Sequence, residues 1–313
     1  MKARWITPAV TAMNQEGHVD LQGNEQIYES LIAGGMDGIL ILGSIGEFYG
    51  IPWEEKKKMI DYGVGVVGHR VPLYVGTGQM DMDRCIELSN YALEKGAEGV
   101  VVISPYYMNL PDSAILNFYH QVADGVKGEI LLYNFPDRTG YDLKPELVYE
   151  LARAHQNIIG IKDTVKDMSH TRELIRRVKT EIPNFQVYSG FDEFFGHNIL
   201  SGGDGCIAGL SNFAPEAAAA CVEAARKEDW GAMCECQRRI DRLMAIYGVG
   251  QQFIPIIKMA MVLKGVRMQP FCARPMLPAT EEETRKIKEI LENSEAGKEK
   301  SGTAAGEGET NKN

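Results

Sequence analysis

The chain has 313 residues, and its 33 Lys and Arg against 43 Asp and Glu give a formal net charge of −10. A hydrophobic content of 44% and a charged content of 24% are ordinary for globular proteins and exclude a mostly disordered or collagen-like chain. The negative balance argues against nucleic acid or an anionic membrane as a partner, because both attract basic surfaces.

The N-terminus has no apolar signal segment, and no run of about 18 apolar residues predicts a membrane span. The 6 cysteines are scattered without a C-x-x-C motif, and the 6 histidines contain no H-x-x-x-H pair. Cys234 and Cys236, the one close pair, should point to different sides of a helix. We therefore expect a cytoplasmic protein with reduced thiols and no metal site.

Short apolar runs bounded by Gly, Asp or Asn predict strands in chain order. The runs cover residues 6–10, 38–42, 71–75, 99–103, 129–133, 158–161, 186–188 and 204–208. Amphipathic helices are predicted between them, among others over 53–67, 81–95, 144–154 and 167–179. Pro52 is expected in the first turn of one helix, and Gly96 after the last turn of the next.

Eight apolar strands separated by helices predict a parallel (β/α)8 TIM barrel, an α/β fold. An open doubly wound sheet is the competing fold, but no G-x-G-x-x-G opens the first helix. We assign residues 1–227 to the barrel and 228–292 to a C-terminal helical extension with helices over 228–247, 252–265 and 280–292. Residues 293–313 are expected to be a disordered tail, since they hold no apolar residue larger than Ala.

Reactive groups of such barrels lie where strands end, which directs attention to Lys162 and Tyr133. Lys162 closes an apolar strand, and a lysine made partly neutral by burial can attack a carbonyl and form a Schiff base. A lysine that merely extends off a strand end is equally compatible with this position. Tyr133 ends the preceding strand and could shuttle protons, although a core tyrosine is the plainer interpretation. The turn that begins at Gly43 offers backbone N–H groups that could bind a carboxylate.

Four motifs resemble the dihydrodipicolinate synthase / N-acetylneuraminate lyase family of class I pyruvate-dependent aldolases. They are Gly-Ser-Ile-Gly-Glu at 43–47, Pro-Tyr-Tyr at 105–107, Tyr-Asn-Phe-Pro-Asp-Arg-Thr-Gly at 133–140 and Gly-Ile-Lys-Asp at 160–163. The resemblance runs from about residue 7 to residue 291. It implies a lyase that makes or breaks a carbon–carbon bond between pyruvate and an aldehyde, without any cofactor beyond the imine on Lys162.

The resemblance also implies roles for individual residues. Lys162 would form the imine, Tyr133 would be the acid and base, and Ser44 would link Tyr133 to Tyr107 in a proton relay. Because the residue that matches Tyr107 often comes from a neighbouring subunit, a homo-oligomer is expected, commonly a homotetramer built as a dimer of dimers. The N–H groups of Ser44 and Ile45 would hold the pyruvyl carboxylate, and the pocket would also be lined by Gly190 and Ile207.

The substrate remains open between two interpretations. Ile45 stands where many members of the family have a hydroxyl residue. Arg138 matches the arginine with which synthases bind the carboxylate of the aldehyde substrate. Asp192, Glu193 and Ser211 instead resemble the polar groups of 2-keto-3-deoxy sugar-acid aldolases. We expect such a sugar-acid aldolase first, and second a 4-hydroxy-tetrahydrodipicolinate synthase that condenses pyruvate with aspartate semialdehyde.

Two other classes are weaker alternatives. A non-catalytic barrel that binds an oxo-acid would not need a nucleophile and a proton relay. A metal-dependent aldolase is disfavoured, because the motifs offer carboxylates such as Glu47 and Asp163 but no histidine.

Overall fold

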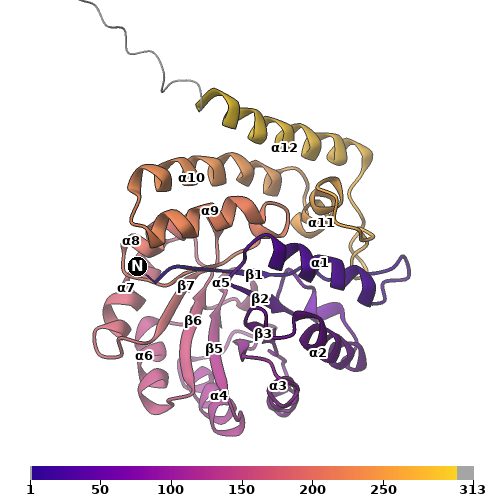
Figure 1. The fold of residues 1–313 in the computed structure, drawn as a ribbon. Helices are drawn as coiled ribbons and strands as arrows, with labels where there is room; N and C mark the ends of the chain where they lie inside the picture. The colour runs from indigo at the N-terminus through magenta and orange to yellow at the C-terminus, as the bar shows by residue number, and fades with distance from the viewer. Residues whose placement is uncertain (1, 302–313) are drawn as a thin grey trace, which may run out of the picture.

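The computed structural model describes residues 2–301, and the side chains as far as residue 294. Eight parallel strands form a closed barrel in chain order, with β8 paired to β1 (Figure 1). The strands are β1 (Arg4–Pro8), β2 (Gly38–Ile41), β3 (Leu73–Gly76), β4 (Gly99–Ile103), β5 (Glu129–Asn134), β6 (Ile158–Asp163), β7 (Gln186–Ser189) and β8 (Gly205–Ile207). The predicted TIM barrel is confirmed.

Helices connect the strands and cover the outside of the barrel (Figure 1). They are α1 (Leu21–Ala33), α2 (Trp53–Val67), α3 (Met82–Lys95), α4 (Asp112–Gly125), α5 (Pro136–Thr139), α6 (Pro145–Ala154), α7 (Met168–Leu174), α8 (Phe195–Leu200) and α9 (Pro215–Arg226). Short 3-10 turns precede α2, α8 and α9: η1 (Phe48–Gly50), η3 (Asp192–Phe194) and η4 (Leu210–Asn212).

Local sequence explains where these helices begin and end. Asp81 caps α3 by accepting N–H groups of its first turn, and Gly96 ends it as predicted with a φ of +109°. Pro52 occupies the N-cap position just before α2, rather than its first turn as predicted. The helix predicted over 167–179 is divided into α7 and a π-helical turn, η2 (Ile175–Lys179).

The chain continues beyond the barrel as α10 (Trp230–Leu243), the 3-10 turn η5 (Met244–Gly248), α11 (Phe253–Leu263) and α12 (Glu281–Ser301). Helix α10 packs on α9, and α12 packs on α10 and α11 (Figure 1). In the described part of the chain no single helix has the length and apolar content to cross a bilayer, although the bent pair of 230–248 and 253–263 passes that test together.

The disordered tail is expected to begin at residue 293, but the structure continues as a helix beyond this point. Helix α12 continues to Ser301, and the Ser294 side chain is buried, with its hydroxyl donating to the Leu291 carbonyl. The helix thus continues beyond Leu291, its last apolar residue, near which the composition predicted its end. Residues 302–313 lie outside the described chain.

Candidate active site

The ends of β5 and β6 bring Tyr133 and Lys162 together. The two residues are register partners in the parallel ladder. Lys162 is 3% exposed, and its Nζ lies 4.3 Å from the centroid of the Tyr133 ring. The structure therefore places a primary amine and a phenol side by side in a buried position at the barrel mouth.

Ser44 extends this pair from the loop that follows β2. Its Oγ lies 3.3 Å from the Tyr133 hydroxyl, so a proton can pass between the two groups. Within the described chain, the backbone N–H groups of Ser44 and Ile45 donate to no backbone carbonyl. These donors are free to bind an anionic group beside Tyr133.

Tyr107 lies away from this cluster in its own chain. Its side chain is 88% exposed, whereas Tyr106 packs its ring edge-on against Phe48. A single chain thus brings Lys162, Tyr133 and Ser44 together without Tyr107.

A mouth cavity of about 460 Å³ opens above Ser44. Its lining includes Ser44, Phe135, Arg138, Gln252 and Met276, and a smaller hollow below it reaches Ser44 and Tyr133. The cavity therefore leads from the protein surface to the predicted proton relay.

Arg138 borders this cavity with its guanidinium 5.4 Å from the Phe135 ring centroid. Asp137 does not pair with it, because Asp137 forms an ion pair of 2.7 Å with Lys166. Among the described residues no carboxylate lies within ion-pair distance of Arg138. The guanidinium is available to an anion that enters the cavity.

The side chains of Asp192 and Ser211 form hydrogen bonds inside the protein, and that of Glu193 does not among the described residues. Asp192 is buried and accepts hydrogen bonds from the Leu210 N–H (2.7 Å) and the Tyr247 hydroxyl (3.0 Å). Burial raises the pKa of Asp192 to about 7 despite these two donors. The backbone carbonyl of Glu193 accepts from Gln237 of α10, whereas its carboxylate oxygen Oε2 is buried and has no hydrogen-bond partner in the described chain. The Ser211 hydroxyl contacts Thr7 Oγ1 at 2.8 Å. None of the three lines the mouth cavity, in contrast to the substrate contacts expected from sequence.

Gly190 lies beside the end of β6. Its N–H donates to the Asp163 carbonyl (2.8 Å), and a Cβ at this position would lie only 1.8 Å from Thr164 Oγ1. Ile207 is fully buried in β8. Ile45 and Tyr247 both lie close to Gly209. A Cβ at Gly209 would be 2.7 Å from Ile45 Cδ1 and 2.8 Å from the Tyr247 hydroxyl.

Sequence reasoning missed Thr164, Tyr247 and the pair of Glu47 with Lys258. Thr164 is 5% exposed, and its hydroxyl has no partner in the described chain. Its place two residues after Lys162 on an extended segment could have identified it. Lys258 was visible as a lone lysine in the apolar helix α11, whereas Tyr247 gave no local signal.

The amino-acid sequence and the fold both match known proteins. The model of the dihydrodipicolinate synthetase family matches residues 1–294. The chain is 36% identical over 287 residues to the Escherichia coli protein named "Putative 2-dehydro-3-deoxy-D-gluconate aldolase YagE", covering 92% of this chain and 95% of that one. It is 35% identical over 286 residues to "Probable 2-dehydro-3-deoxy-D-pentonate aldolase YjhH" of E. coli, covering 91% and 95%.

The crystal structure of YagE in complex with pyruvate superimposes with a TM-score of 0.91, covering 94% of this chain and 98% of that one at 36% identity. A dihydrodipicolinate synthase from Thermotoga maritima gives a TM-score of 0.88 at 26% identity, covering 94% of this chain and 99% of that one. The protein therefore belongs to the dihydrodipicolinate synthetase family, and the pyruvate-dependent lyase class expected from its motifs is confirmed.

Proposed function

We propose that this protein is a Schiff-base aldolase that cleaves a 2-keto-3-deoxy sugar acid to pyruvate and a hydroxyaldehyde. The observation that carries the chemistry is the buried contact of the Lys162 amine with Tyr133, whose hydroxyl faces Ser44. The sugar-acid substrate is supported by the names of two relatives that each match more than nine-tenths of this chain.

In the proposed reaction, the Lys162 amine attacks the C2 carbonyl of the substrate and water leaves to give the imine. Tyr133 carries the protons of this step and then accepts the proton of the C4 hydroxyl. The C3–C4 bond breaks, its electron pair forms the enamine of pyruvate, and the aldehyde departs. Protonation at C3 and hydrolysis then release pyruvate and restore Lys162.

The same geometry supports the binding of the two ends of the substrate. The N–H groups of Ser44 and Ile45 would hold the carboxylate beside the imine. The hydroxylated chain would extend into the mouth cavity, where Gln252 and Arg138 offer donors.

A synthase that condenses pyruvate with aspartate semialdehyde is the second candidate. It is favoured by Arg138, which borders the cavity with no carboxylate of its own and could bind a carboxylate-bearing aldehyde through two parallel hydrogen bonds.

Borohydride trapping tests the imine. Incubation with pyruvate and borohydride should add one pyruvyl-derived mass per chain on the peptide that contains Lys162, and Lys162→Ala should abolish both labelling and turnover. Lys56 is a suitable control because it is also a buried amine, and burial lowers its pKa to about 8. Lys56→Ala should label as the wild type does, and labelling at Lys56 would refute the assignment of Lys162.

Turnover of Tyr133→Phe should fall by roughly two to four orders of magnitude, as general acid–base catalysis contributes about that much. A panel of 2-keto-3-deoxy sugar acids, with pyruvate release as the signal, tests the substrate. Efficient condensation with aspartate semialdehyde that is lost in Arg138→Ala, together with no cleavage of any sugar acid, would establish the synthase instead.

We also propose a homo-oligomer in which Tyr107 completes the relay of a neighbouring chain, since its side chain is 88% exposed in its own. Mixing inactive Tyr107→Phe and Lys162→Ala subunits should then restore part of the activity. Absence of recovery despite demonstrated subunit exchange would remove Tyr107 from the neighbouring site. A cytoplasmic location stays a prediction from sequence.

A further inference from the structure

The residues that directly follow Tyr133 and Lys162 also lie together, on the outside of the barrel wall. Asn134 is the register partner of Asp163, one position after Tyr133 and Lys162. Because side chains alternate along a strand, these two point away from the catalytic pair, toward α7. Both are buried, at 2% and 1% exposed.

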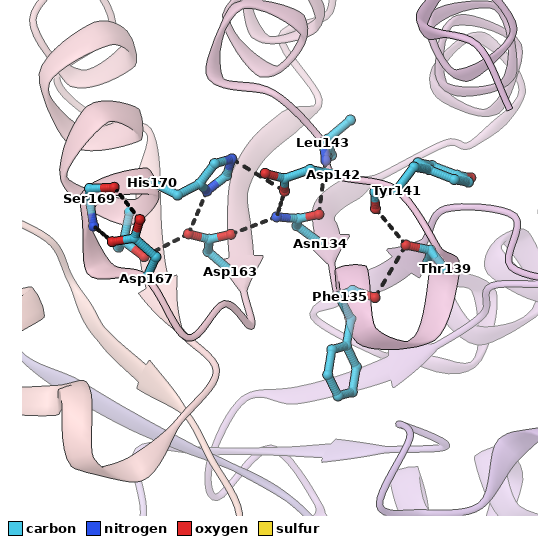
Figure 2. Close-up of polar contacts among 11 residues, drawn as sticks. Asn134, Phe135, Thr139, Tyr141, Asp142, Leu143, Asp163, Asp167, Ser169 and His170 are labelled. Carbon is cyan, nitrogen blue, oxygen red and sulfur yellow. Dashed lines mark hydrogen bonds and ion pairs between the residues drawn. The ribbon is translucent and has the colours of Figure 1, made fainter. Parts of the chain in front are cut away.

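Four side chains close a ring of polar contacts here, and we refer to Asn134, Asp142, Asp163 and His170 as the four-residue network (Figure 2). Asn134 Nδ2 donates to Asp163 Oδ1 (2.9 Å) and Asp142 Oδ1 (2.7 Å). His170 Nδ1 forms a hydrogen bond of 3.0 Å with Asp163 Oδ2. Its Nε2 lies 3.4 Å from Asp142 Oδ1, within ion-pair distance, but has no hydrogen-bond partner among the described residues.

Backbone contacts tie this network to the strand ends. The Leu143 N–H donates to Asn134 Oδ1 (3.0 Å), and the Thr164 N–H donates to the Asn134 carbonyl (2.9 Å). The Asp163 carbonyl accepts the Gly190 N–H, and its Oδ2 accepts the Thr171 hydroxyl (2.6 Å). The ends of β5, β6 and β7 are thereby fixed to one another directly behind the catalytic pair.

A doubly protonated His170 suits its place between two carboxylates. An imidazolium carries two N–H groups, one toward each carboxylate, whereas the neutral ring carries only one and turns the lone pair of its other nitrogen toward a carboxylate. Burial lowers the pKa of His170, but the hydrogen bond to Asp163 and the charges of Asp163 and Asp142 raise it more, so the pKa is raised overall.

Other charged groups around His170 are few. Asp167 lies at the N-cap of the same helix. The adjoining hollow of about 560 Å³ is also bordered by Asp137, Lys166 and Glu173, of which Asp137 and Lys166 pair with each other.

We propose that His170 is a positioning residue, whose imidazolium joins Asp163 to Asp142 and so holds Lys162 in register with Tyr133. This inference rests on the proposed Schiff-base function. Since the pKa of His170 is raised, the joined state is complete below its ordinary value of about 6.5 and is lost as pH rises through the higher folded value. Turnover should therefore have an alkaline limb that belongs to His170.

The test compares His170→Asn with His18→Asn in the full-length protein. An Asn amide can still donate to Asp163 but is neutral and too short to reach Asp142. His18 is the matched control, because its Nδ1 also lies 3.0 Å from a carboxylate, that of Glu55, but the side chain is 65% exposed. Pyruvate trapping with borohydride, kcat, KM and the pH profile of kcat are measured for each.

We expect His170→Asn to trap pyruvate completely at saturation but to lose about tenfold or more in kcat, since small misplacements of reacting groups are costly. Its alkaline limb should disappear, whereas His18→Asn should match the wild type. Wild-type kcat and pH profile in folded His170→Asn would overturn the inference. Failure of the wild type itself to trap pyruvate would instead overturn the proposed function.

Asp142→Asn gives an independent test if His170→Asn does not fold. It removes one charge that faces His170 but keeps an oxygen acceptor. The alkaline limb should shift to lower pH together with the His170 titration followed by NMR of ¹⁵N-labelled imidazole. An NMR titration that shifts while the limb of kcat stays in place would refute the positioning role.

Discussion

Replacing Lys258 with Met would leave the Glu47 carboxylate buried without its cation. Both side chains of this ion pair are 0% exposed. Lys258 also donates to the Phe271 carbonyl (2.6 Å), and Glu47 Oε2 accepts the Ala273 N–H (2.6 Å). The pair thus joins the loop that bears Ser44 to α11 and to the segment before α12.

Removal of one partner from a buried ion pair costs about 3–5 kcal/mol, largely because the remaining charge is uncompensated. At about 2 °C per kcal/mol for a chain of this size, Tm should fall by roughly 6–10 °C. Lys144→Met is the matched control, since Lys144 pairs with Asp112 at 2.7 Å with side chains 58% and 46% exposed. Its cost should be about 0–1 kcal/mol.

Urea unfolding followed by circular dichroism, at one fixed protein concentration, measures both variants. The double variant Glu47→Gln/Lys258→Met should be more stable than Lys258→Met alone, because it no longer buries an unpaired carboxylate. The reasoning is refuted if Lys258→Met costs no more than Lys144→Met, or if the second substitution recovers nothing.

Three further outcomes follow from the site and its surroundings. Gly190→Ala should lower kcat/KM and reduce the free energy of unfolding by roughly 1–3 kcal/mol, because its Cβ would lie 1.8 Å from Thr164 Oγ1. Kinetics and urea unfolding measure these effects. Adding Thr164→Ala should restore part of the stability. The pKa of Asp192 is raised to about 7, so its protonation stabilises the fold at low pH, and this stabilisation is lost as pH rises from about 4 through 7. The Tm of Asp192→Asn relative to wild type should therefore rise over this window. A difference in Tm that stays constant would contradict this reasoning. Iodoacetamide followed by peptide mapping should label Cys234, which is exposed, before the buried Cys85 and Cys206, and equal rates would argue against the packing.

Much of the barrel could be predicted because its signals are local. The predicted strand over 99–103 and helix over 53–67 match β4 and α2 in both bounds. Strand β4 is a continuous apolar run, and Gly68 ends α2 in a left-handed conformation, so both signals are local. The placement of Lys162 beside Tyr133 followed from the rule that parallel strands present their ends at one face.

The remaining features depend on contacts between distant segments. Asp192 carries the expected motif, but its carboxylate accepts a hydrogen bond from Tyr247, 55 residues later in the chain. The partner of Glu47 is 211 residues away. The hydrophobic pattern also does not encode the π-helical turn η2 or the extension of α12 to Ser301.

The mouth cavity and the Lys162–Tyr133 pair are built by different segments of the chain, so evolution can change one without the other. Lys162 and Tyr133 are register partners on β5 and β6, whereas Arg138, Gln252 and Met276 come from three segments outside these strands. Substitutions, insertions or deletions in those segments can reshape the cavity while Lys162 and Tyr133 keep their register. A barrel of this kind can acquire a new substrate by exchanging its rim, with no interval in which carbon–carbon bond cleavage is lost.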